Sequence, residues 1–109
     1  MNERREGIRV ALNVTVSEKL VAGSAKAKAV NLSSAGMRYT KPGNTSSHGA
    51  KEVFLEFCLD GEADPIKVMG WVVEEIAKGN SLETAVTFMF LQEGDEKKIN
   101  TYVKSQLPA

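Results

Sequence analysis

The arginines of this chain gather at its N-terminus. Of the four arginines in 109 residues, Arg4, Arg5 and Arg9 fall within the first nine positions, whereas the ten lysines are spread along the rest. A guanidinium group offers a planar fork of N–H donors that suits two-point contact with a phosphate or a guanine edge. Arg5 and Arg9 form Arg-x-x-x-Arg, which indicates an anion-binding arm. A solvated terminal charge cluster, balanced by Glu3 and Glu6, is the alternative and is common for such runs.

A second polar group runs from Asn31 to Gly36, with the sequence NLSSAG. Asn and Ser side chains supply donors and acceptors in tight turns, and Gly36 can adopt a positive φ that other residues resist. We expect this turn to present backbone N–H groups and hydroxyls toward an anion. Taken alone, an ordinary hairpin turn explains the same residues.

Together, the two segments resemble the signature of the PilZ domain family, receptors for the bacterial second messenger cyclic di-GMP. Arg-x-x-x-Arg is followed about twenty residues later by Asn-x-Ser-x-x-Gly, a joint pattern that ordinary residue frequencies produce in on the order of one sequence in a thousand. The resemblance covers nearly the whole chain and implies a six-stranded antiparallel β-barrel with a helix after the last strand. One departure is Thr84-Ala85, where the family often has a glycine early in the last strand.

The resemblance also implies which residues bind the ligand. The expected ligand-binding residues are Arg4, Arg5, Arg9, Asn31, Ser33 and Gly36. Arg5 and Arg9 would grip guanine bases and phosphates, and Asn31 would contact a guanine edge.

The remaining three positions have narrower expected roles. Ser33 would bond a phosphate or a nearby base, and Gly36 would let the backbone approach the ligand. In similar domains an arginine at the position of Arg4 favours two stacked ligand molecules over one. No other cofactor and no metal is expected.

The apolar pattern predicts about six strands and one C-terminal helix, an all-β fold closed by a helix. Period-two alternation predicts strands at residues 8–16, 24–32, 37–40, 53–59, 66–76 and 81–90. After Gly94 the period becomes helical, with Asp95 as the expected N-cap and Pro108 as the stop. The apolar stripe of that helix consists of Ile99, Tyr102, Val103 and Leu107.

The composition of the chain disfavours several classes of protein. Fourteen basic and fourteen acidic side chains leave no formal net charge, which disfavours a general DNA or RNA binder. A single cysteine agrees with a reducing cytoplasm, and no apolar run approaches the ~20 residues that span a bilayer. We therefore expect a cytoplasmic protein without membrane insertion, built as an arginine arm at residues 1–9 and a barrel with its helix at residues 10–109.

Several other residues could have either a functional or a structural role. Trp71 could stack on a base, but a core or barrel-wall position is the more common use of a strand tryptophan. His48 has no plausible metal partners, and Cys58 is expected to be a small buried hydrophobe. Met37 and Arg38 follow the turn directly, so either could line the ligand site. Acidic pairs such as Glu74-Glu75 are expected to be solvated.

No catalytic motif is present, so we expect a binding protein and not an enzyme. The resemblance implies a cyclic di-GMP receptor that changes an unidentified protein partner in trans, in processes such as motility, exopolysaccharide production or biofilm formation. We expect the arm to close on the ligand as it binds. The alternatives are a barrel that binds a protein partner without any ligand and, last, a binder of single-stranded nucleic acid, which would need exposed aromatics among basic strands.

Overall fold

The structure is a computed structural model that describes residues 9–20, 23–42, 52–59 and 63–106. Arg4 and Arg5, His48, and the predicted helix end at Leu107 and Pro108 lie outside these residues. The arm proposed for residues 1–9 is therefore described only at Arg9. In the described parts of the chain, no helix has the length and apolar character needed to cross a membrane.

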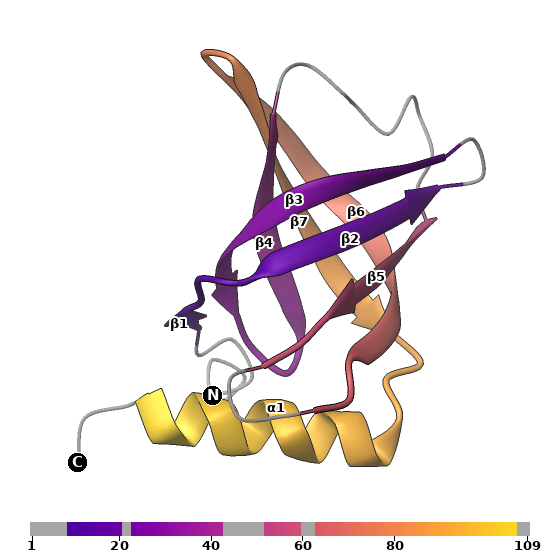
Figure 1. Cartoon of the computed structure of the whole chain (residues 1–109), viewed down its shortest axis with the longest axis vertical. Helices are drawn as coiled ribbons and strands as arrows, with labels where there is room; N and C mark the ends of the chain where they lie inside the picture. Colours follow the sequence, from indigo (N-terminus) through magenta and orange to yellow (C-terminus); the bar gives the residue numbers. More distant parts are fainter. Residues whose placement is uncertain (1–8, 21–22, 43–51, 60–62, 107–109) are drawn as a thin grey trace.

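The described residues form seven strands and one helix, whose arrangement is drawn in Figure 1. They are β1 (Val10–Ala11), β2 (Thr15–Leu20), β3 (Gly23–Leu32), β4 (Gly36–Pro42), β5 (Glu52–Phe57), β6 (Ile66–Lys78), β7 (Ser81–Met89) and α1 (Glu93–Gln106). All strand pairs are antiparallel, and the order β2-β5-β6-β7-β4 is closed by β3, which pairs with both β2 and β4. The short β1 adds to β3 on the same edge as β2. The predicted six-stranded antiparallel barrel with a C-terminal helix is confirmed.

The chain departs from the predicted first strand and helix start. Residues 8–16 do not form one strand, because the chain leaves regular pairing at residues 12–14 and resumes as β2 up to Leu20. Helix α1 begins at Glu93, so Asp95 lies in its first turn and is not the N-cap. An acidic first turn still stabilises the helix, because carboxylates interact favourably with its N-terminal dipole.

Phe90 and Cys58 lie on the surface, so the buried position predicted for Cys58 is wrong. Phe90, the last residue of the predicted strand 81–90, is 85% exposed and has a φ of 55°. The reason is that β7 ends at Met89, and the chain turns there toward α1. Cys58 is exposed for the same reason, since β5 ends at Phe57. Trp71 lies in the barrel wall with its side chain exposed on the outer face.

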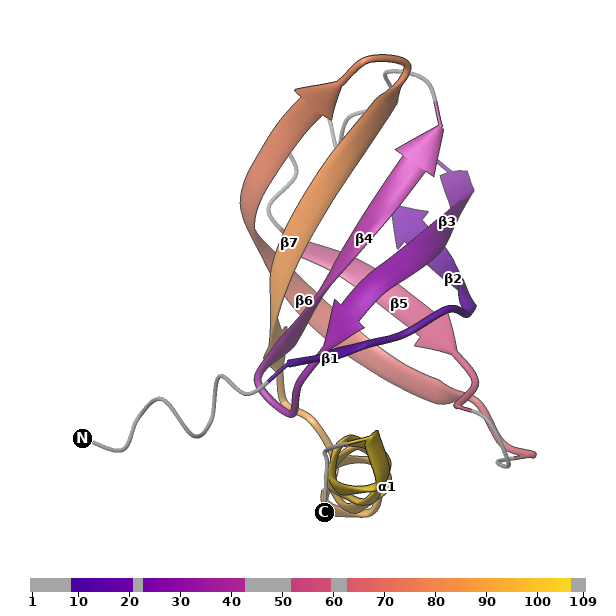
Figure 2. The same cartoon turned by 90° about the vertical axis from the view of Figure 1, so that its left-hand side faces the viewer.

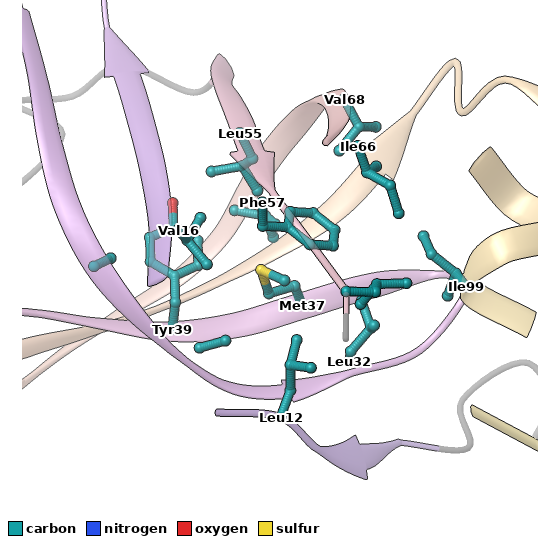
Figure 3. Close-up of a cluster of buried hydrophobic side chains, with 14 of the residues drawn as sticks. Leu12, Val16, Leu32, Met37, Tyr39, Leu55, Phe57, Ile66, Val68 and Ile99 are labelled. Atoms are coloured by element: carbon teal, nitrogen blue, oxygen red, sulfur yellow. The ribbon is translucent and has the colours of Figure 1, made fainter. Parts of the chain in front are cut away.

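Inward-facing side chains from the strands fill the barrel, as the period-two pattern predicts (Figure 3). Val53, Leu55 and Phe57 are all buried along β5. Helix α1 lies across one end of the barrel (Figure 2). Its residues Ile99 and Val103 are buried in the same core. Full burial of a side chain such as Ile99 contributes roughly 1.5–3 kcal/mol. The helix therefore closes the barrel end.

A charged cluster is buried inside the barrel. Glu18 of β2 accepts a hydrogen bond from the Tyr39 hydroxyl at 2.5 Å and from Lys41 Nζ at 3.0 and 3.2 Å, and all three side chains are fully buried. Small inward residues on the intervening β3, Ala27 and Ala29, leave room for this contact. Burial, followed by the charge and hydrogen bond of Glu18, raises the pKa of the Tyr39 hydroxyl well above its usual range.

Removing one partner from this cluster should be costly. We expect Lys41→Met to lower the free energy of unfolding by about 3–5 kcal/mol, because the Glu18 carboxylate would stay buried without its counter-charge. Lys19→Met is the matched control, since Lys19 pairs with Glu56 at 3.3 Å on the surface and such pairs contribute about 1 kcal/mol or less. Urea denaturation measures both. Equal losses in the two variants would contradict a buried electrostatic role for Lys41.

Candidate functional site

The turn between β3 and β4 is held by Ser33. Its side chain is fully buried, and Oγ accepts hydrogen bonds from the N–H groups of Ala35 at 3.1 Å and Gly36 at 3.3 Å. The Ser33 N–H donates to the Gly36 carbonyl at 2.9 Å. The N–H groups of Ser33, Ala35 and Gly36 are therefore used inside the turn. The prediction that the turn presents such groups to an anion is wrong for these three, because the Ser33 hydroxyl and the Gly36 carbonyl already bind them.

Gly36 is needed for space and not for an unusual φ. In the described residues, only Gly79 and Phe90 have positive φ, so Gly36 does not use the positive φ that a glycine can adopt. A Cβ atom at position 36 would lie 2.1 Å from the Val86 carbonyl oxygen, far inside van der Waals contact. Gly36 pairs with Thr87, so this contact lies where β4 meets β7. The glycine therefore lets the two strands approach beside the turn.

A β-bulge turns Asn31 to the outer face of the barrel. Along β3, Ala27 and Ala29 face inward, so strict alternation would also point Asn31 inward. The register with β4 shifts between Ala29 and Asn31, which inserts Val30 as an extra residue. Leu32 then becomes fully buried, and Asn31 meets solvent. Bulges commonly re-aim side chains in this way.

Arg9 and Asn31 meet on this outer face. Arg9 Nη1 donates a hydrogen bond to Asn31 Oδ1 at 3.0 Å. A guanidinium group only donates, so the amide oxygen must face it, and the amide NH₂ of Asn31 is left for another acceptor. Partial burial, and then the positive charge of Arg38, lowers the pKa of Arg9. The structure thus brings together Arg9 and Asn31, one residue from each of the two sequence segments.

Glu74, which was expected to be solvated, is paired with Arg38 in the structure. Arg38 Nη2 lies 2.9 Å from Glu74, and Arg38 Nη1 lies 2.9 Å from Glu83. These hydrogen bonds raise the pKa of Arg38. The expectation that Glu74 is merely solvated is wrong. The sequence signal that could have placed Glu74 on the outer face is the break in alternation at Val72-Val73, where a second bulge lies. Met37, by contrast, is fully buried in the core and does not line the outer face.

The outer face near the turn therefore offers a set of hydrogen-bond donors. The Arg9 guanidinium, the free amide NH₂ of Asn31 and the Arg38 guanidinium suit a ligand with anionic groups and a base with ring or carbonyl acceptors. Among the described residues, no group of three or more His, Cys, Asp or Glu side chains is placed to hold a metal ion.

Comparison with known proteins decides the family. The model of the PilZ domain family matches residues 3–105. This chain belongs to the PilZ domain family. Arg9, Asn31, Ser33 and Gly36 thus lie in a PilZ barrel at the junction of β1, β3 and β4. No curated protein sequence matches the chain significantly.

Solved structures show the same PilZ fold. Similar structures include the Bacillus subtilis inhibitor of motility, MotI/DgrA, with a TM-score of 0.79 and 14% identity over 90% of this chain and 48% of that one. The PilZ domain of Escherichia coli YcgR with c-di-GMP has a TM-score of 0.70 and 11% identity over 90% and 87% of the two chains. Borreliella burgdorferi PlzA in complex with c-di-GMP has a TM-score of 0.66 and 10% identity over 94% and 51%. The chain spans about half the length of MotI and PlzA.

Gly36 of this PilZ domain gives a direct test of the site's framework. We expect Gly36→Ala to lower the free energy of unfolding by at least about 2 kcal/mol, because its methyl group would collide with the Val86 carbonyl and the β4–β7 pair would have to separate. Thermal and urea denaturation measure the loss.

Gly94→Ala is the matched control, because a Cβ there meets nothing within 4 Å. Gly94 lies in α1, where alanine is the better helix former, so this variant should be neutral or more stable by up to about 1 kcal/mol. A Gly36→Ala protein as stable as the Gly94→Ala protein would refute the close approach.

Proposed function

We propose that this chain is a receptor for cyclic di-GMP. The observation that carries the proposal is the hydrogen bond between Arg9 and Asn31, which joins the two segments of the signature across 22 positions of sequence. Membership in the PilZ family and the c-di-GMP complexes of YcgR and PlzA support it. The ligand combines two phosphodiesters and two guanine bases, which match guanidinium and amide donors.

Arg9 and Asn31 form the described part of the proposed site. Arg9 would contact a phosphate or a guanine edge while it orients the Asn31 amide, whose NH₂ would donate to an acceptor on guanine. Arg5, four residues before Arg9 in the signature, would bind the ligand from the segment that precedes the barrel. Arg4 would favour two stacked ligand molecules, because guanidinium groups also stack on purine faces.

Ser33 and Gly36 would support binding mainly through the backbone. The Ser33 hydroxyl accepts two N–H bonds in this structure, so its first role is to fix the turn that carries Asn31. A direct bond from Ser33 to a phosphate or base stays a prediction. Gly36 keeps β4 against β7, which holds the turn after Asn31 in place.

We further propose that the chain signals by binding and not by catalysis, in the cytoplasm, through a protein partner. Closing of the arginines on the ligand would create a surface that exists only in the bound state, which is what a switch requires. The likeness to an inhibitor of motility supports motility as one process that such a switch could control. Exopolysaccharide production and biofilm formation are further proposed outputs.

A ligand-independent protein adaptor is the second candidate. Exposed apolar side chains on the outer face of the barrel favour it, because large apolar groups on a sheet surface often mark contact with another protein. Phe54, Trp71 and Val73 are all exposed there. Binding of cyclic di-GMP distinguishes the two candidates.

Calorimetric titration with cyclic di-GMP tests the proposal. We expect saturable binding at micromolar or tighter affinity by the wild-type chain, and at least about tenfold weaker binding by Arg5→Ala and Arg9→Ala, since each loses a charge-assisted contact. The molar ratio distinguishes one bound ligand from two, and Arg4→Ala should lower a ratio of two.

Two controls make the titration specific. Lys67→Ala removes an exposed positive charge from the outer face of β6 and should bind like the wild type. Cyclic di-AMP offers the same phosphodiesters without guanine edges and should bind far more weakly. Absence of heat and of any thermal shift with cyclic di-GMP in large excess would reject the receptor, and the adaptor would then become the leading candidate.

A further inference from the structure

Arg38 lies in one row with Asn31 on the outer face of the barrel. The register pairs Asn31 of β3 with Arg38 of β4, Arg38 with Ala85 of β7, and Ala85 with Glu74 of β6. Neighbouring strands lie about 4.8 Å apart, so these residues form a continuous line across four strands. Arg9 adjoins the same line through its hydrogen bond to Asn31.

Two β-bulges are needed to build this row. Without the extra residue Val30, Asn31 would face the core, as described above. The register shift between Val72 and Glu74 inserts Val73 in the same manner, so that Val72 is buried while Val73 and Glu74 both face outward. Each bulge therefore re-aims the polar residue that follows it, and the two residues flank Arg38 in the row.

Arg38 is braced from the side away from Arg9. Glu74 and Glu83 each contact one of its terminal nitrogens at 2.9 Å, and Glu83 also contacts Lys78 at 3.0 Å. Ala85 lies between Arg38 and Glu74 in register, and its small side chain leaves their path clear. The Arg38 side chain is 27% exposed, so it is partly buried and held in place.

The braced guanidinium still has donors for a ligand. Arg38 has five N–H bonds, of which two are used for Glu74 and Glu83, and three have no partner among the described residues. Its positive charge also acts on Arg9, whose pKa it lowers after the effect of burial. Two like charges held near each other favour an anion that contacts both.

We propose that Arg38 is a further ligand-binding residue, which together with Arg9 contacts a phosphate group of the cyclic dinucleotide, and that Glu74 and Glu83 hold its guanidinium in position. This inference rests on the proposed function and adds to it an arginine outside both segments of the signature. Arg38 is thus a contact residue, whereas Glu74 and Glu83 are positioning residues.

Titration of Arg38→Gln with cyclic di-GMP tests the contact. We expect affinity to fall at least about tenfold relative to the wild type, with unchanged far-UV circular dichroism, because a charge-assisted contact is lost. Lys78→Gln is the matched control, since it removes the same charge and also loses a bond to Glu83. That variant should bind within about twofold of the wild type. Arg38→Lys keeps the charge without the fork and should give an intermediate loss.

Salt dependence separates contact from bracing. Over about 0.05 to 0.5 M salt, a range in which the screening length falls severalfold, binding by Arg38→Gln should weaken less steeply than binding by the wild type. Glu74→Gln should lower affinity by a smaller factor and keep the wild-type salt dependence, because it leaves the phosphate contact in place. If Arg38 had only a structural role, Arg38→Gln would change the stability of the protein, but its affinity for cyclic di-GMP would depend on salt as steeply as that of the wild type.

A second measurement does not depend on the folding of Arg38→Gln. In nitrogen-proton NMR spectra, the Nε–Hε signal of Arg38, assigned by its loss in Arg38→Lys, should shift when cyclic di-GMP is added to the wild type. Wild-type binding that Arg9→Ala loses and Arg38→Gln keeps, or an unmoved Arg38 signal, would overturn this inference alone. Failure of the wild type to bind would overturn both the inference and the proposed function.

Discussion

The close approach of β4 to β7 at Gly36 is the constraint on which the site depends. The missing side chain lets the start of β4 lie against the Val86 carbonyl, and β4 then pairs with both β3 and β7 to close the barrel. The turn held by Ser33 lies directly before this contact. Asn31 and Arg38 extend from the two ends of the turn, so their spacing is fixed by the same backbone.

Charge is divided between the inside and the outside of the barrel. Inside, Glu18, Tyr39 and Lys41 satisfy one another, and buried polar groups of this kind cost stability unless every member is paired. Outside, among the described residues, Arg38 is paired with Glu74 and Glu83, while Arg9 contacts the neutral side chain of Asn31. A chain with no net charge can thus still offer arginine N–H donors to a small dianion.

Alternation in the sequence predicted most of the strands and the buried face of β5, because each buried position there is apolar, whereas the closed barrel was predicted from the family resemblance. Prediction from the pattern failed where the alternation changes. The bulges at Val30 and Val73 move Asn31 and Glu74 outward, and a bulge depends on pairing with a distant strand, which local sequence does not contain. The buried role of Lys41 and the steric role of Gly36 were hidden for the same reason. Both depend on residues far away in sequence, Glu18 and Val86.

A backbone NMR titration of the wild-type chain with cyclic di-GMP would locate the bound ligand on the barrel. We expect the amide signals that shift to belong to Arg9 and Val10, to residues 31–36 and to Arg38, while those of α1, at the end of the barrel, move little. Shifts centred instead on the exposed face around Phe54 and Trp71 would contradict the proposed site. The absence of any shift at saturating ligand would contradict the receptor function itself.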